Sequence, residues 1–208
     1  MPDWTKDLYV LRYHWKWVAL LVVLGVGSIL LIRPAWATTV LKKSFPNLVH
    51  EADTIAVGTV TAIETEQKQD VPYTLVTFTN LDILKGDDTL TELTLRILGG
   101  PGEDGLILNI AGVPEFALGD RMVVFVVGNE TQAVPFVGMW QGVYRVTFDP
   151  ERESETVTTH NGTPLTTLPD GTNDPPIVQD GQPAAYQQRG PALTLEAFTQ
   201  SIVEALHE

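Results

Sequence analysis

Apolar and polar positions along the middle of the chain follow the period of β-strands. Leu93–Leu98 and Val143–Phe148 alternate between apolar and polar residues, as strands with one buried face do. Thr54–Ile63 and Tyr73–Leu84 are longer runs rich in β-branched and aromatic residues. Met122–Val127 is continuously apolar, which predicts a strand buried on both faces. The pattern therefore predicts a mainly β domain.

Helical periodicity is confined to two short segments. In Phe45–Asp53 the apolar residues fall at helical spacing after a Pro-Asn pair, which predicts a short N-terminal helix. A C-terminal helix is expected over residues 193–208, where Thr194 is placed to cap it. Its apolar stripe consists of Leu195, Phe198, Ile202 and Leu206. Such a stripe normally packs on the domain's own core.

The order of these elements predicts a small OB-like barrel over residues 45–150, closed or partly open. Gly58 lies inside a strand, where a glycine usually marks a bulge or a sharp bend of the kind small barrels need. After residue 150 the composition changes. Residues 151–192 are expected to form a hairpin around His160-Asn161-Gly162 and then a Pro/Gly-rich linker, before the C-terminal helix packs on the barrel.

The N-terminal segment carries the features of a secretory signal. Arg12 and Lys16 precede the uncharged run Trp17–Ile32, and Ala35-Trp36-Ala37 supplies a small-x-small cleavage site. We therefore expect residues 1–37 to be removed, leaving Thr38 at the N-terminus. The alternative is an uncleaved membrane anchor, although a spanning helix needs roughly 20 apolar residues. Both interpretations place the domain outside the cytoplasm, as a secreted, periplasmic or cell-envelope protein.

Charge and composition exclude several classes of function. The formal net charge is -13, which repels phosphate backbones and predicts no nucleic-acid partner; contact with a membrane is expected only through an uncleaved N-terminal segment. The chain has no cysteine, so it has neither disulfides nor a thiol nucleophile. Serines and histidines after residue 37 are few and match no catalytic or metal motif. We expect no catalytic activity and no cofactor.

Two glycine-flanked loops are the candidate contact sites. Gly99–Gly105 contains Glu103 and Asp104, and Gly138–Gly142 contains Trp140 and Gln141. An aromatic platform beside an amide, with carboxylates close by, would suit a neutral or cationic partner. The hypothesis requires the two loops to lie near each other. In the alternative interpretation, the glycines only permit tight turns and Trp140 closes the core.

Acidic loops leave one further alternative, a Ca²⁺ site. Glu103 and Asp104 in the first glycine loop and Asp170 and Asp174 downstream supply oxygen ligands of the kind that Ca²⁺ takes. Solvated carboxylates in turns are far commoner, so we expect no bound metal.

Two stretches resemble known proteins. Leu48–Gly58 followed by Tyr73–Gly86 resembles the opening of netrin-like, tissue-inhibitor-of-metalloproteinase-like domains, which begin with a short helix, an "ADvvvxGxV" strand and a strand ending in "xLKG". This resemblance implies an OB-type barrel flanked by helices. Leu93–Gly100, Gly112–Phe125 and Phe136–Val146 are similar to a group of uncharacterised exported bacterial proteins.

The resemblance does not carry over an inhibitory residue. The inhibitors chelate a protease zinc through the amine and carbonyl of an N-terminal cysteine, and this chain has no cysteine. The expected function is therefore a binding or interaction module for a protein or small-molecule partner. The alternative is a protease inhibitor or a protease-associated accessory domain.

Overall fold

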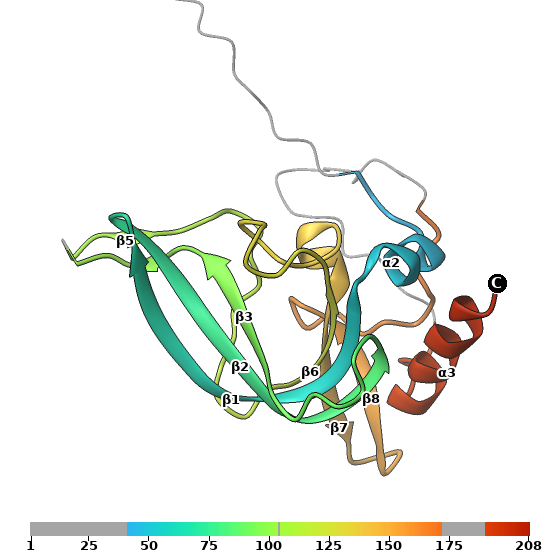
Figure 1. Cartoon of the computed structure of the whole chain (residues 1–208). Coiled ribbons are helices and arrows are strands. Elements are labelled where there is room, and N and C mark those ends of the chain that lie inside the picture. The colour runs from blue at the N-terminus through green and yellow to red at the C-terminus, as the bar shows by residue number, and fades with distance from the viewer. Residues whose placement is uncertain (1–40, 104, 172–189) are drawn as a thin grey trace, which may run out of the picture. The chain divides into compact units, whose positions relative to one another are not determined.

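A six-stranded antiparallel sheet forms the centre of the protein (Figure 1). The computed structural model describes residues 41–103, 105–171 and 190–208. The strands lie in the order β3-β2-β1-β6-β7-β8, with β1 Thr54–Lys68, β2 Val71–Lys85, β3 Leu93–Leu98, β6 Arg121–Val126, β7 Val143–Asp149 and β8 Ser154–Thr159. A separate small hairpin consists of β4 (Gly100–Pro101) and β5 (Ile107–Leu108). The prediction of a mainly β domain is confirmed.

Barrel closure is not found among the strands that the structure describes. β3 and β8 stand at the two ends of the sheet order, and no ladder pairs them with each other. The closed or partly open barrel therefore stays a prediction.

Two helices cover one face of the sheet. Helix α2 (Phe45–Glu51) and helix α3 (Leu195–Leu206) pack with buried residues of β1, β6, β7 and β8. Phe198 of α3 lies against Tyr144, with ring centroids 4.9 Å apart, and is fully buried. The Thr194 side chain accepts a hydrogen bond from the Ala197 amide at 3.2 Å, so the predicted cap and the predicted docking of the C-terminal helix are confirmed.

A second core lies on the opposite face of the sheet. It contains Phe78 of β2 and Leu95 of β3, and it is covered by Phe116 and Phe136 from the loops on either side of β6. Strand β6 contributes alternate residues to the two cores, which explains why its sequence is continuously apolar. The expected burial of both of its faces is confirmed.

Gly58 allows β1 and β2 to approach each other closely. A Cβ atom at this position would lie 2.8 Å from Leu81 Cδ2 and 3.2 Å from Phe78 Cβ. The pairing register of the two strands shifts between Val57 and Thr59. The predicted bulge at Gly58 is therefore present.

The segment after Pro150 adds β8 to the sheet and then folds back on it. The chain turns after Thr159, where the Gly162 amide donates to the Thr159 carbonyl, and the Leu165 amide reaches the Val157 carbonyl at 3.0 Å. The turn expected at Asn161-Gly162 is thus present. The predicted signal segment and residues 172–189 of the predicted linker lie outside the described residues. No helix that the structure describes has the length and apolar character needed to cross a membrane.

Candidate functional site

The long β1–β2 hairpin ends in a two-residue turn. Lys68 pairs with Val71, and both loop residues, Gln69 and Asp70, have positive φ (53° and 62°). This is the conformation of the type I′ turn, whose twist matches that of the flanking strands. The turn places Gln69 and Asp70 at the tip of the hairpin.

The first glycine loop lies against this tip. The Thr74 hydroxyl donates to the Gly99 carbonyl at 2.8 Å, and the Gly99 amide donates to the Pro72 carbonyl at 2.9 Å. A Cβ atom at Gly100, whose φ is +125°, would lie 2.7 Å from the Thr74 hydroxyl oxygen. The Gly-Gly pair is therefore required for the small β4–β5 hairpin to lie on β2.

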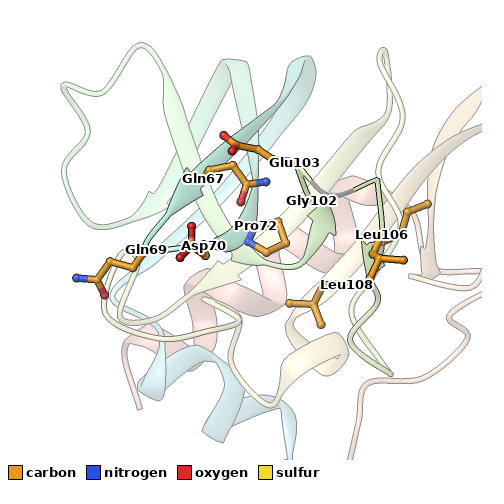
Figure 2. A pocket seen from close by; sticks show the side chains of 9 residues that line it. Gln67, Gln69, Asp70, Pro72, Gly102, Glu103, Leu106 and Leu108 are labelled. Carbon is orange, nitrogen blue, oxygen red and sulfur yellow. The ribbon is translucent and has the colours of Figure 1, made fainter.

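The two hairpins enclose a surface pocket of about 710 Å³. Its described lining consists of Gln67, Gln69, Asp70, Pro72, Gly102, Glu103, Leu106, Ile107 and Leu108. Figure 2 shows Gln67, Pro72 and Glu103 on one side of the pocket and Leu106 and Leu108 on the other. The described lining combines apolar side chains with two carboxylates and two carboxamides, and none of these described residues is basic.

Leu106 and Ile107 give this pocket an apolar rim. Their side chains are 70% and 75% exposed, the largest values among the exposed large hydrophobic residues that the structure describes. Glu103, one of the predicted contact residues, lines the same pocket. Asp104, the second predicted acidic contact, lies outside the described residues.

Trp140 lies in a 3-10 helix, η1 (Met139–Gly142), and is half-buried. Its six-membered ring covers Gly112, where an added Cβ would lie 2.5 Å from Trp140 Cζ3. The His160 ring is also close, with its centroid 6.4 Å from that of the Trp140 ring. One part of the indole is therefore packed against the protein and the rest faces solvent, which combines features of the predicted platform and of the predicted plug.

Gln141 is engaged by the protein itself. Its Oε1 accepts from the Lys43 amide at 2.8 Å, and its Nε2 donates to the carbonyls of Leu41 (2.9 Å) and Gly138 (3.2 Å). Both ends of the carboxamide thus hold the segment that enters α2. Gln141 would have to release these bonds before it could bind a partner.

The predicted contact residues belong to two different surroundings. Glu103 lines the pocket at the hairpin tip, whereas Trp140 and Gln141 contact residues 41–43, Gly112 and His160. Sequence reasoning missed Gln67, Asp70 and the apolar run Leu106–Leu108. The signals available were the largely polar stretch between Ile63 and Tyr73, where the two long strand-like runs end and begin, and three apolar residues directly after a glycine loop.

Arg145 organises the turn that carries His160. Its guanidinium donates to the Asp120 carboxylate at 2.5 Å, to the Glu115 carbonyl at 2.5 Å and to the His160 carbonyl at 3.0 Å. Partial burial, and then the charge of Arg145, lower the pKa of His160 below its usual 6.5. Each of the three guanidinium nitrogens thus has a structural partner, so Arg145 holds these loops together.

The described residues contain no group of three or more His, Cys, Asp or Glu side chains that could hold a metal ion. Two of the four carboxylates that the Ca²⁺ alternative named, Asp104 and Asp174, lie outside the described residues.

Comparison with known proteins yields no relative: no family model, no curated protein and no solved structure matches the chain.

Proposed function

We propose that this protein is a non-catalytic binding module that acts outside the cytoplasm and holds a protein or small-molecule partner at the tip of the β1–β2 hairpin. The observation that carries the proposal is the pocket rim, where Leu106 and Ile107 are 70% and 75% exposed beside a pocket of about 710 Å³. Large apolar side chains gathered at an exposed pocket are typical of contact surfaces.

The charge of the pocket selects the class of partner. Asp70 and Glu103 are the charged residues of the described lining, and the chain as a whole has a net charge of -13. Attraction at the pocket and over longer range therefore favours a neutral or cationic partner. The same charge argues against nucleic acid.

The location outside the cytoplasm rests on the sequence of residues 1–37, where a basic start, an apolar run and a small-x-small site follow one another.

The finer fold assignment, a partly open OB-type barrel of the netrin-like kind, belongs to the same proposal. It is supported by the loop that follows β6, which reaches two separated strands. Its Ala133 carbonyl accepts from the Leu98 amide of β3 at 2.7 Å, while its Val137 amide donates to the Phe125 carbonyl of β6 at 3.0 Å. The loop thus links two strands that β1 and β2 separate in the sheet.

Site-specific crosslinking tests the proposed site. A photoreactive benzoylphenylalanine is placed at Ile107, and for comparison at Val203, which is 42% exposed on α3. In cells of the source organism we expect a discrete crosslinked product from position 107 and none of the same mass from position 203. A product common to both positions, or none from position 107, would contradict the pocket as the contact site. A protease recovered specifically at position 107 would favour the accessory or inhibitor alternative.

A further inference from the structure

Strand β1 has a free edge over its second half. Strand β6 pairs with β1 only from Thr54 to Thr59, and Val60 adds backbone hydrogen bonds to Gly119 and Asp120. From Thr61 to Lys68, no described segment pairs with β1 on the side away from β2. Figure 1 shows this half of β1 along the outside of the sheet.

The turn determines which backbone groups face outward. In a two-residue hairpin the flanking residues, here Lys68 and Val71, exchange their backbone hydrogen bonds with each other. Because the direction alternates along a strand, the amides and carbonyls of Ile63, Thr65 and Gln67 face away from β2. Strand β2 shows the same alternation, because the Pro72 carbonyl faces away from β1 and accepts a hydrogen bond from the Gly99 amide.

The other two edges of the sheet are covered. On β3, the Asn129 side chain accepts from the Arg96 amide and donates to the Thr94 carbonyl, and Ala133 binds Leu98. On β8, the Val157 amide donates to the Leu193 carbonyl and its carbonyl accepts from Leu165. Open edges invite pairing with another chain, and proteins usually cover or distort them. Between Ala62 and Lys68, the free half of β1 has no bulge and no described segment covers its edge.

The two faces of this free segment differ in chemistry. Glu64, Glu66 and Lys68 lie on one face, where Glu64 and Glu66 stand opposite Leu75 and Tyr73 of β2 and Glu66 forms an ion pair with Arg96 at 4.0 Å. Ile63 lies on the other face and is 39% exposed. Gln67 lines the pocket, so the edge leads directly into it. A strand with basic side chains on one face and apolar side chains on the other would match both faces.

We propose that residues 61–68 of β1 accept an extended, basic and apolar segment of a partner protein as an added strand, with the end of that segment entering the pocket. This inference rests on the proposed function and names its partner class. Main-chain hydrogen bonds would supply the affinity, and the side-chain pattern the selectivity, as in other cases of strand addition. The opposing explanation is that Glu64, Glu66 and Lys68 only keep the edge soluble.

The probe is an acetylated and amidated six-residue peptide of alternating lysine and valine, and the matched control replaces each lysine with glutamate. Both are added to the ¹⁵N-labelled full-length protein, and amide hydrogen exchange is followed by NMR. At a lysine-peptide concentration ten times the Kd of the complex, we expect hydrogen exchange of the Ile63, Thr65 and Gln67 amides to slow about tenfold. The glutamate peptide should leave these amides unchanged.

Two variants separate the backbone contribution from the charge contribution. Thr65→Pro removes an outward amide that β2 does not use, and Thr65→Val retains it. Glu64→Lys reverses a charge on the edge, and Glu92→Lys makes the same change at an exposed residue before β3. We expect Thr65→Pro and Glu64→Lys each to weaken lysine-peptide binding about 3- to 10-fold, since a hydrogen bond or an exposed charge contributes about that much. The two controls should bind as the wild type does.

Three outcomes would overturn the inference. Equal binding of both peptides, or no binding of the lysine peptide, would exclude the partner class. Protection confined to Leu106–Leu108 would exclude strand addition while leaving the pocket, and thus the proposed function, in place. Protection of the edge amides without peptide, rising with protein concentration, would assign the edge to a second copy of this chain. Failure of the Ile107 crosslink, together with slowed exchange at the edge amides, would exclude the pocket as the contact site and leave strand addition in place.

Discussion

The two halves of β1 are parts of one strand with opposite roles. Residues 54–60 lie between β2 and β6, and their side chains alternate between the two cores. Residues 61–68 pair with β2 alone, and five of these eight residues are exposed to solvent. The comparison teaches that burial is divided along the strand: the first half anchors the sheet, and the second half carries the exposed edge at which we propose recognition.

The largest effect on stability is expected on the face of the sheet that the helices cover, where the first half of β1 is buried. Phe198→Ala should lower the free energy of unfolding by about 3–5 kcal/mol, because a fully buried aromatic leaves a cavity. Val203→Ala on the same helix, where the side chain is 42% exposed, should cost below about 1 kcal/mol. Chemical denaturation measures both. Similar losses from the two variants would mean that α3 is not docked as described.

Matched isoleucines test the comparison directly. Ile55 is fully buried in the first half of β1, whereas Ile63 is 39% exposed in the second. Ile55→Ala should cost about 2–5 kcal/mol and Ile63→Ala within about 1 kcal/mol, measured by urea unfolding. If the costs are equal, the distal half is covered in solution and the division of roles is wrong.

A smaller, local effect is expected at the small hairpin on the tip. Gly100→Ala places a Cβ 2.7 Å from the Thr74 hydroxyl at a φ of +125°, so the β4–β5 hairpin should loosen at a cost of about 1–3 kcal/mol. Faster amide exchange at Ile107 and Leu108 would report the change. Gly105→Ala also has a positive φ (+79°) but no atom within 4 Å, so it reports the cost of a positive φ without a steric contact. Equal exchange in the two variants would show that the hairpin does not need its contact with β2.

The smallest effect concerns His160, far along the chain from the tip. Its pKa is lowered in the folded protein by burial and by Arg145, so the unfolded chain binds a proton more readily. Stability should therefore fall as the pH drops below about 6.5, until the folded pKa is passed. Thermal unfolding at pH 7.5 and 5.5 should show a smaller decrease for His160→Gln than for the wild type. If the decrease is the same in the two proteins, His160 does not contribute to the pH dependence of stability.

Periodicity was sufficient to predict the elements whose environment is set by burial. The continuous apolar run of β6, the bulge at Gly58, the cap at Thr194 and the buried stripe of α3 all follow from local sequence and are present. Closure of the barrel could not be predicted in the same way, because the order of strands in a sheet depends on long-range pairing that no local pattern encodes.

The candidate site was predictable only in part for a similar reason. Glu103 was identified from its glycine loop, yet its neighbours Gln67 and Asp70 come from another hairpin. Gln141 was expected to be available, but its partners in residues 41–43 lie far away in sequence. The turn residues Gln69 and Asp70 both adopt positive φ, but neither is a glycine, so the sequence did not mark the position of this tight turn.

The tight turn at Gln69-Asp70 also constrains how this protein can change in length. Side chains and backbone groups in a strand alternate with a period of two, counted here from the turn. Inserting or deleting one residue between Glu64 and Lys68 would reverse the alternation of every residue before the change, so that the Ile63 amide would face β2 and Glu64 would move to the face where Ile63 now lies. Changes of two residues would preserve both patterns. Natural or engineered variants with an intact edge should therefore differ here by even numbers of residues.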